Sequence, residues 1–226
     1  MEGIKIKETV KQNIARRGMA QAMKACWSSV PHFTQMANAR ADNLMKVKKE
    51  VNLTYNDVLI KCVVNAVKKA PKINSTLEGD DWIIYEDVNV SVAVITDHGL
   101  FVPVIRNADQ MNVEGISAAV KELSGKAASG KITLDDMALG TITVSNLGAT
   151  GVETGTPIIN MPQGALVFFG NIRKVPVVDE SDAIVVGHEI GMCIAYDHKF
   201  IDGMLAQEFT TKLKAEIEQV TKESLY

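Results

Sequence analysis

Cysteine is scarce in this chain, which contains three in 226 residues. Cys26, Cys62 and Cys193 are odd in number, far apart, and set in apolar or helical surroundings. A disulfide framework needs paired cysteines and a zinc site needs closely spaced ligands, so this distribution argues against both. The cysteines therefore favour a reducing compartment.

Blocks of lysine and arginine are also missing, and the net charge is −3. Sequence-independent binding of phosphate backbones needs a concentrated basic surface, so nucleic acid is not an expected partner. No segment approaches the roughly 18 apolar residues of a membrane helix, so no membrane association is expected. We expect a cytoplasmic location, or the mitochondrial matrix if a targeting segment has been removed.

The sequence shows no internal repeat, no low-complexity tract and no linker rich in proline, alanine and serine. Its hydrophobic content of 46% is enough for a sizeable core. A chain of this length fits one large domain, and we expect a single one over residues 1–226.

Hydrophobic spacing predicts a mixture of helices and strands rather than strict alternation. Asn56 is the expected N-cap of one helix, and Asp97-His98-Gly99 is expected to join two strands in a hairpin. The pattern favours an α/β two-layer sandwich, a mixed sheet covered by helices, over a doubly wound fold. The expected helices are 9–29, 42–50, 56–70, 112–130 and 203–222, and the expected strands are 32–40, 82–86, 89–96, 100–106, 141–148, 165–171, 173–179 and 183–196.

Three common site signatures do not occur. The glycine-rich run 148–155 has neither dinucleotide-binding nor P-loop spacing. Ser145 lies in VSNLG, which is not the G-x-S-x-G elbow of hydrolases, so a serine nucleophile is disfavoured. The histidines lack the paired spacing of metal ligands and predict no metal site; they are His32, His98, His188 and His198.

The segment IAYDHKFIDGM, residues 194–204, interrupts an apolar run with two acids, a histidine and a glycine. In one interpretation His198 ends a strand, and Asp202 is the N-cap of the helix that begins at Gly203. In the other, His198 transfers protons near neutral pH and the nearby carboxylate orders its surroundings. The spacing alone does not choose between them.

Several segments, taken together, resemble a known family. They closely resemble the catalytic domain of the dihydrolipoamide acyltransferase components of 2-oxoacid dehydrogenase complexes, and the resemblance covers nearly the whole chain. The pattern His-x-x-x-Asp-Gly is shared with the related chloramphenicol acetyltransferases. The segments are VPHFTQ (30–35), GLFVPVIRN (99–107), TITVSNLG (141–148), TPIINMPQ (156–163) and DHKFIDG (197–203).

The resemblance implies a chloramphenicol acetyltransferase-like domain that forms a homotrimer. Coenzyme A and lipoamide are then expected to approach each subunit interface from opposite ends of a channel. His198 is the implied general base, and Ser145 the implied hydroxyl that hydrogen-bonds the oxyanion from the neighbouring subunit. Asn146 and Gly148, in the same turn as Ser145, are the expected substrate-binding residues, and Asp202 is the expected structural acid.

The basic partner of Asp202 stays open between three residues. The family usually carries an arginine where this chain has Lys48, and lysine does not reproduce the planar fork of arginine. Arg16, Arg17 and Lys48 are therefore all candidates.

The implied function is transfer of an acyl group between dihydrolipoamide and coenzyme A by direct thioester exchange. Both are substrates, and no cofactor bound covalently to this chain is expected. The implied partners are a lipoyl domain and other 2-oxoacid dehydrogenase components, and the trimer can belong to a larger cubic core. The chain itself is expected to hold no lipoyl or peripheral-subunit-binding domain. The alternatives are a non-catalytic oligomeric core that organises partner enzymes, and an acetyltransferase that acts on a hydroxyl acceptor.

Overall fold

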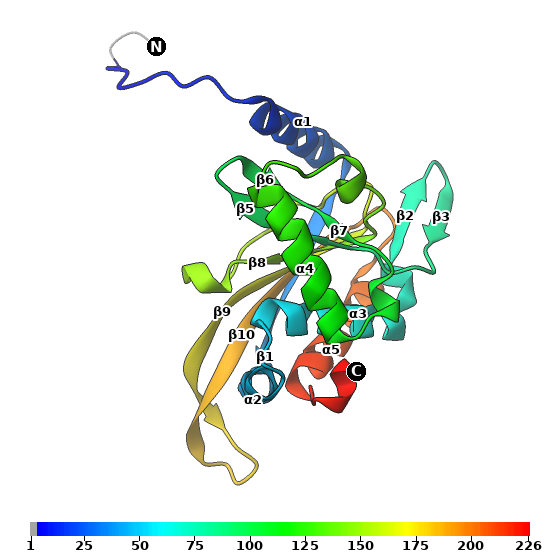
Figure 1. Ribbon diagram of the computed structural model, residues 1–226. Coiled ribbons are helices and arrows are strands. Elements are labelled where there is room, and N and C mark those ends of the chain that lie inside the picture. Colours follow the sequence, from blue (N-terminus) through cyan, green and yellow to red (C-terminus); the bar gives the residue numbers. More distant parts are fainter. Residues whose placement is uncertain (1–3) are drawn as a thin grey trace.

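A six-stranded mixed sheet forms the centre of the protein in a computed structural model, which describes residues 4–226 (Figure 1). The strand order is β1-β10-β9-β8-β4-β7. Strand β8 runs parallel to both of its neighbours, and the other pairs are antiparallel. The strands of this sheet are β1 (His32–Arg40), β4 (Val90–Val92), β7 (Val104–Ile105), β8 (Ile142–Asn146), β9 (Ala165–Val178) and β10 (Ile184–Asp197).

Four helices pack with the sheet around one hydrophobic core, which confirms the two-layer sandwich. Two small hairpins lie outside the main sheet, β2 (Ser75–Glu78) with β3 (Asp81–Ile84) and β5 (Val94–Thr96) with β6 (Gly99–Phe101). The second hairpin confirms the turn predicted at Asp97-His98-Gly99. The helices are α1 (Ile14–Ser29), α2 (Asp42–Val51), α3 (Tyr55–Lys69), α4 (Val113–Ala128) and α5 (Gly203–Glu218), of which the last four contribute to this core.

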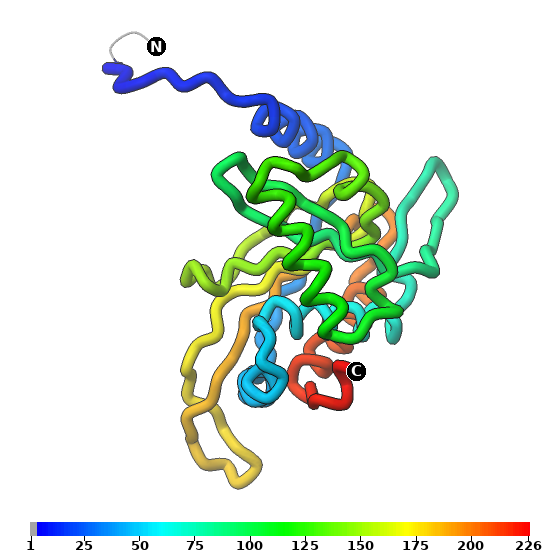
Figure 2. The backbone as a smooth tube through the Cα atoms, viewed as in Figure 1, coloured from blue at the N-terminus to red at the C-terminus, as the bar shows by residue number. Residues whose placement is uncertain are grey.

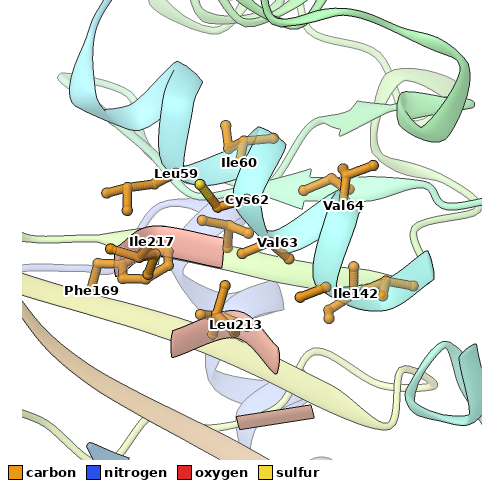
Figure 3. Packing of buried hydrophobic residues seen from close by; sticks show 14 of the residues in the cluster. Leu59, Ile60, Cys62, Val63, Val64, Ile142, Phe169, Leu213 and Ile217 are labelled. Carbon is orange, nitrogen blue, oxygen red and sulfur yellow. The ribbon is translucent and has the colours of Figure 1, made fainter. Parts of the chain in front are cut away.

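Helix α3 occupies the middle of the core (Figure 3). Leu59 and Val63 of this helix lie with Leu213 and Ile217 of α5 and with Phe169 of β9, and all five side chains are almost fully buried. Truncating one such residue to alanine typically costs about 2–5 kcal/mol of stability. The contact between α3 and α5 therefore holds the helical layer together over the sheet.

The start of α3 corrects one sequence prediction. Asn56 is not its N-cap, because the helix begins at Tyr55 and Thr54 is the capping residue. The Thr54 hydroxyl accepts from the Asp57 N–H at 3.2 Å, and the Asp57 carboxylate accepts from the Thr54 N–H at 3.0 Å. This reciprocal capping box satisfies two backbone donors, whereas a single asparagine cap satisfies one.

A second, smaller cluster lies on the opposite face of the sheet. Successive residues of a strand point to opposite faces, so Phe169 joins the main core while Phe168 joins the second cluster. The end of α1 and the segment that follows β8 cover this face. The buried members are Cys26, Val30, Ile159, Leu166, Phe168, Cys193 and Ala195.

Strand β9 is longer than the sequence suggested, because the strands predicted over 165–171 and 173–179 are one continuous strand. Pro176 lies inside it, opposite Val186. Proline lacks an N–H and is tolerated where a strand edge is free. Strand β8 pairs with β9 only as far as Phe169, so the far half of β9 has a free edge.

The other boundaries differ in smaller ways. The strand predicted over 89–96 is split into β4, which pairs with β8, and β5. The helix predicted over 9–29 begins at Ile14, because Asn13 is its N-cap and accepts a hydrogen bond from Arg16 N–H. The predicted helices over 112–130 and 203–222 are confirmed as α4 and α5.

Two parts extend away from the body of the protein (Figure 2). Residues 4–13, before α1, point outward, and the far halves of β9 and β10 form a projecting ribbon. Ile14 and Trp27 of α1 are 80% and 67% exposed. No helix among the described residues is long and apolar enough to cross a membrane.

Candidate active site

His198 follows directly after the last residue of β10 and is exposed. Its backbone N–H donates to the Pro31 carbonyl at 3.0 Å, which ties the turn to the start of β1. Its imidazole lies against the Phe33 ring, with the ring centroids 4.3 Å apart and the planes tilted by 40°. His198 is therefore accessible to a substrate and held on one side by an aromatic ring.

Asp202 is the N-cap of α5. Its Oδ1 accepts from the Met204 N–H at 3.0 Å and from the Leu205 N–H at 2.8 Å. The helix-cap interpretation of this aspartate is confirmed. Because the cap fixes where α5 begins, Asp202 also fixes the end of the loop that carries His198.

The three cations considered for Asp202 lie elsewhere in the chain. Within residues 4–226, no salt bridge joins Asp202 to any of them. Arg16 and Arg17 belong to α1, and the Arg17 guanidinium donates to the Gln12 carbonyl at 3.1 Å. Lys48 Nζ lies 5.6 Å from the centroid of the Tyr55 ring.

Ser145 is half-buried near the end of β8, in a tightly built turn. The side chain of Asn146 accepts from the Gly148 N–H at 2.9 Å, and the Leu147 N–H donates to the Phe169 carbonyl at 3.0 Å. A Cβ at position 148 would lie 2.7 Å from the Gly170 carbonyl oxygen. Only glycine fits there, so the turn that follows Ser145 has little freedom.

A cavity of about 510 Å³ opens beside this turn. Asn146 and Gly148, the two expected substrate-binding residues, line it together. The N-terminal end of α3 forms another wall, where backbone N–H groups point out of the helix. The remaining lining residues are Thr54, Tyr55, Asn56, Leu59, Ala93, Ala149, Gly170, Ile172 and Ile190.

Ser145 and His198 do not meet within one chain. Ser145 pairs with Phe168 on β9, and Phe168 pairs with Cys193 on β10, five residues before His198. Two strand spacings and five extended residues separate the two groups by on the order of 20 Å. A single subunit therefore presents the hydroxyl and the imidazole at two separate places.

Asp197 and Lys199 flank His198 and were not among the predicted site residues. The Lys199 Nζ lies 3.3 Å from one oxygen of Asp197, and the Lys199 backbone N–H donates to the other at 3.0 Å. The sequence signal for this pair is an acidic residue on one side of a histidine and a basic residue on the other.

His32 is a second histidine close to the site, and both of its ring nitrogens have hydrogen-bond partners within the fold. Its Nε2 accepts from the Ile159 N–H at 3.1 Å, and its Nδ1 lies 2.9 Å from the Val30 carbonyl. Because an N–H only donates and a carbonyl only accepts, these contacts require a neutral ring with its proton on Nδ1. The Cys26 thiol donates to the Ile159 carbonyl at 3.1 Å, and burial raises the pKa of this thiol. Cys26 therefore fastens the end of α1, and His32 the start of β1, to the segment around Ile159.

The fold defines a structural class, the domains with the chloramphenicol acetyltransferase-like fold. The structure of chloramphenicol acetyltransferase covers 98% of this chain and 100% of its own, with a TM-score of 0.54 and 12% identity. That likeness establishes the shared fold and confirms the fold class expected from the sequence.

The family follows from closer comparisons. The model of the 2-oxoacid dehydrogenases acyltransferase catalytic domain matches residues 5–225, and the chain belongs to this family. The lipoamide acyltransferase component of the Bacillus subtilis branched-chain alpha-keto acid dehydrogenase complex is 35% identical over 222 residues. That match covers 93% of this chain and 52% of the relative, so this chain spans about half the length of the curated relative.

Two solved structures are similar over almost their whole length. Azotobacter vinelandii dihydrolipoamide acetyltransferase, studied for the role of a serine, a histidine and an asparagine in its catalytic mechanism, has a TM-score of 0.90 at 30% identity. The cubic core of a pyruvate dehydrogenase multienzyme complex has a TM-score of 0.90 at 31% identity. Each match covers 98% of this chain and 95% of the other.

Proposed function

We propose that this chain is an acyltransferase that moves an acyl group between dihydrolipoamide and coenzyme A. Membership of the acyltransferase family supports the reaction class. The observation that carries the proposal is the exposed imidazole of His198, held at a strand end against Phe33, together with a rigid serine turn beside a cavity.

In the proposed reaction, His198 acts as the general base. A thiol is mostly protonated near neutral pH, so a neutral imidazole beside the sulfur gains by taking its proton. The thiolate attacks the carbonyl carbon of the thioester and forms a tetrahedral oxyanion. When this intermediate collapses, the carbon–sulfur bond of the leaving thiolate breaks, and the proton on His198 passes to that sulfur. The acyl group has then moved directly from one thiol to the other.

In this proposal the Ser145 hydroxyl donates a hydrogen bond to the oxyanion. A donor fixed where negative charge develops stabilises the transition state more than the ground state. The stiffness of the turn supports this role, because Gly148 and Asn146 hold the backbone that follows Ser145. The cavity lined by Asn146 and Gly148 is the proposed binding place for one of the two thiol substrates.

The proposed role of Asp202 is structural, because this residue caps α5. In the Azotobacter vinelandii acetyltransferase, the asparagine studied with the histidine follows it by four positions, as Asp202 follows His198. Asparagine and aspartate cap helices about equally well, so both residues suit this task. Pairing of Asp202 with Arg16, Arg17 or Lys48 is proposed only for the assembled protein, where a neighbouring subunit supplies the cation.

The proposed active assembly is a homotrimer in which each site combines Ser145 of one subunit with His198 of the next. The separation of the two groups within one chain supports it, as do the exposed apolar residues of α1. The similarity to a cubic core supports further assembly of the trimers. The proposed partners are a lipoyl domain and the other components of a 2-oxoacid dehydrogenase complex. The cytoplasm or mitochondrial matrix suits the three free, buried cysteines.

The test is the rate of acyl transfer from a panel of acyl-coenzyme A donors to free dihydrolipoamide, with chloramphenicol as a hydroxyl acceptor in a parallel assay. We expect transfer to the thiol and none to the hydroxyl. Transfer only to chloramphenicol would replace the lipoamide assignment. A trimer without transferase activity toward any donor would favour the non-catalytic core.

A further inference from the structure

The turn that carries His198 is closed by its two neighbours in sequence. Oδ1 of Asp197 accepts from the backbone N–H of Lys199 at 3.0 Å, and Oδ2 lies 3.3 Å from Lys199 Nζ. The Asp197 carboxylate thus spans His198 and meets Lys199 twice. We call this arrangement the Asp197–Lys199 clasp.

The carboxylate in the clasp is buried, with 6% of the Asp197 side chain exposed, whereas 38% of the Lys199 side chain is exposed. A buried carboxylate is costly unless hydrogen bonds and an opposite charge compensate it. Across the described chain, the Asp197 carboxylate has no hydrogen-bond donor other than Lys199. The position and the stability of the buried Asp197 carboxylate therefore depend on Lys199.

The other hydrogen bonds of the turn join backbone atoms, and within the described residues none reaches the His198 imidazole. The N–H of His198 donates to Pro31, and the N–H of Ile201 donates to the Asp197 carbonyl at 3.0 Å. Phe33 supports one side of the imidazole. The backbone geometry between Asp197 and Lys199 therefore sets the position from which the His198 side chain extends.

We propose that Asp197 and Lys199 are positioning residues that hold His198 in its reactive orientation through the clasp. This inference rests on the proposed function, in which His198 is the base. A base must lie within hydrogen-bond reach of the thiol proton, and a displacement of about 1 Å is enough to lower a rate by about a hundredfold. Loss of the clasp is expected to reduce turnover while leaving the substrate cavity beside Ser145 unchanged.

The principal variant is Lys199→Met, which keeps the length and apolar stem of the side chain and removes its charge. We expect kcat per folded trimer to fall by about tenfold to a hundredfold, with KM for coenzyme A unchanged within about twofold. Lys199→Arg restores a cation and is expected to recover most of the lost kcat, although its geometry differs.

The chain offers a matched control in Lys126→Met. The Lys126 side chain is also 38% exposed, and its Nζ lies 3.1 Å from the partly buried carboxylate of Asp136 and 2.9 Å from that of Glu122. Among the described residues, none of the three forms a hydrogen bond or an ion pair with His198. We expect wild-type kcat for this variant. An equal loss of kcat in both variants would assign the effect to a general loss of an ion pair and overturn the inference.

The double variant Lys199→Met with His198→Ala shows whether the clasp acts through the base. If it does, adding Lys199→Met to the His198→Ala protein lowers kcat by less than about a further twofold, because no base remains to be positioned. A further loss as large as in the wild-type background would overturn the inference. So would a folded Lys199→Met trimer with unchanged kcat.

Failure of the clasp and failure of the proposed function give different results. If His198→Ala itself keeps wild-type turnover, His198 is not the base and the proposed function fails first. If His198→Ala is inactive and Lys199→Met is fully active, only the clasp fails.

Asp197→Asn is a second variant that tests the clasp. Its side-chain oxygen still accepts from the Lys199 N–H, but the ion pair with Lys199 Nζ is lost. It is expected to match Lys199→Met, and wild-type kcat in folded Asp197→Asn would also overturn the inference.

Discussion

Ser145 and His198 lie near the ends of two strands in one sheet, yet the two ends are built differently. Ser145 is half-buried in a turn where a glycine packs against the Gly170 backbone. His198 is exposed, and its ring is supported by Phe33 alone among the aromatic contacts of the described chain. The serine end is rigid and lies beside a cavity, whereas the base end is open. In the proposed reaction each end supplies one group, the hydroxyl or the imidazole, so the sheet of one subunit carries two incomplete halves of the proposed site.

The largest effect is expected at the end of the sheet that carries His198. We expect His198→Ala to lower the transfer rate by about 10²–10⁴-fold, because a positioned general base typically contributes that much. The fold is expected to survive, since the side chain is exposed. Steady-state kinetics with circular dichroism and thermal unfolding check both points. Near-wild-type turnover in a folded variant would reduce His198 to a strand-end residue.

At the serine end, we expect Ser145→Ala to lower kcat by about 10²–10³-fold with little change in coenzyme A affinity. The lost hydrogen bond forms mainly in the transition state, so kcat changes and binding does not. Kinetics combined with direct binding measurements separate the two quantities. A raised KM with unchanged kcat would instead make Ser145 a residue that binds the ground state.

A smaller effect is expected from Gly148→Ala, which tests the stiffness of the serine end. The added Cβ would lie 2.7 Å from the Gly170 oxygen and 3.1 Å from Oδ1 of Asn146, so the turn has to move. We expect kcat to fall about tenfold, since the oxyanion donor moves with the turn. Gly125→Ala in α4 is the control, because its Cβ would meet no atom within 4 Å. Equal activity of the two variants would show that the turn need not be rigid.

The smallest expected effect concerns Asp202. Asp202→Ala removes the acceptor for the Met204 and Leu205 N–H groups and is expected to lower the free energy of unfolding by about 0.5–2 kcal/mol. Asp202→Asn keeps an acceptor and is expected to lose less stability than Asp202→Ala, because only the proposed ion pair with a neighbouring subunit is removed. Thermal and urea unfolding of the two variants measure the difference. If Asp202→Asn is as destabilised as Asp202→Ala, the negative charge matters more than the cap.

The sequence predicted local structure well where a signal is contained in a few neighbouring residues. Hydrophobic spacing predicted a helix over 203–222, and one of the two interpretations of this segment made Asp202 its cap; both are confirmed. The N-cap of α3 was misplaced because two good capping residues, Thr54 and Asn56, lie close together. Only the reciprocal bond from Asp57 distinguishes them.

The site was less predictable because it depends on contacts between distant residues. Phe33 and His198 are far apart in sequence and meet only because β1 pairs with β10. A helix was predicted over 9–29, and its apolar residues Ile14 and Trp27 stay exposed in one chain. Sequence spacing shows that a helix has an apolar face and does not show whether its own chain covers that face.

The central claim is that one active site needs two subunits, and subunit mixing tests it most directly. Inactive Ser145→Ala and inactive His198→Ala proteins are mixed in equal amounts under conditions that allow subunits to exchange. An interface is restored when an intact Ser145 of one subunit meets an intact His198 of the next. In random trimers this occurs at about a quarter of the interfaces, so about a quarter of wild-type activity is expected to return. No recovery despite proven exchange, or full activity in a demonstrated monomer, would contradict the shared site.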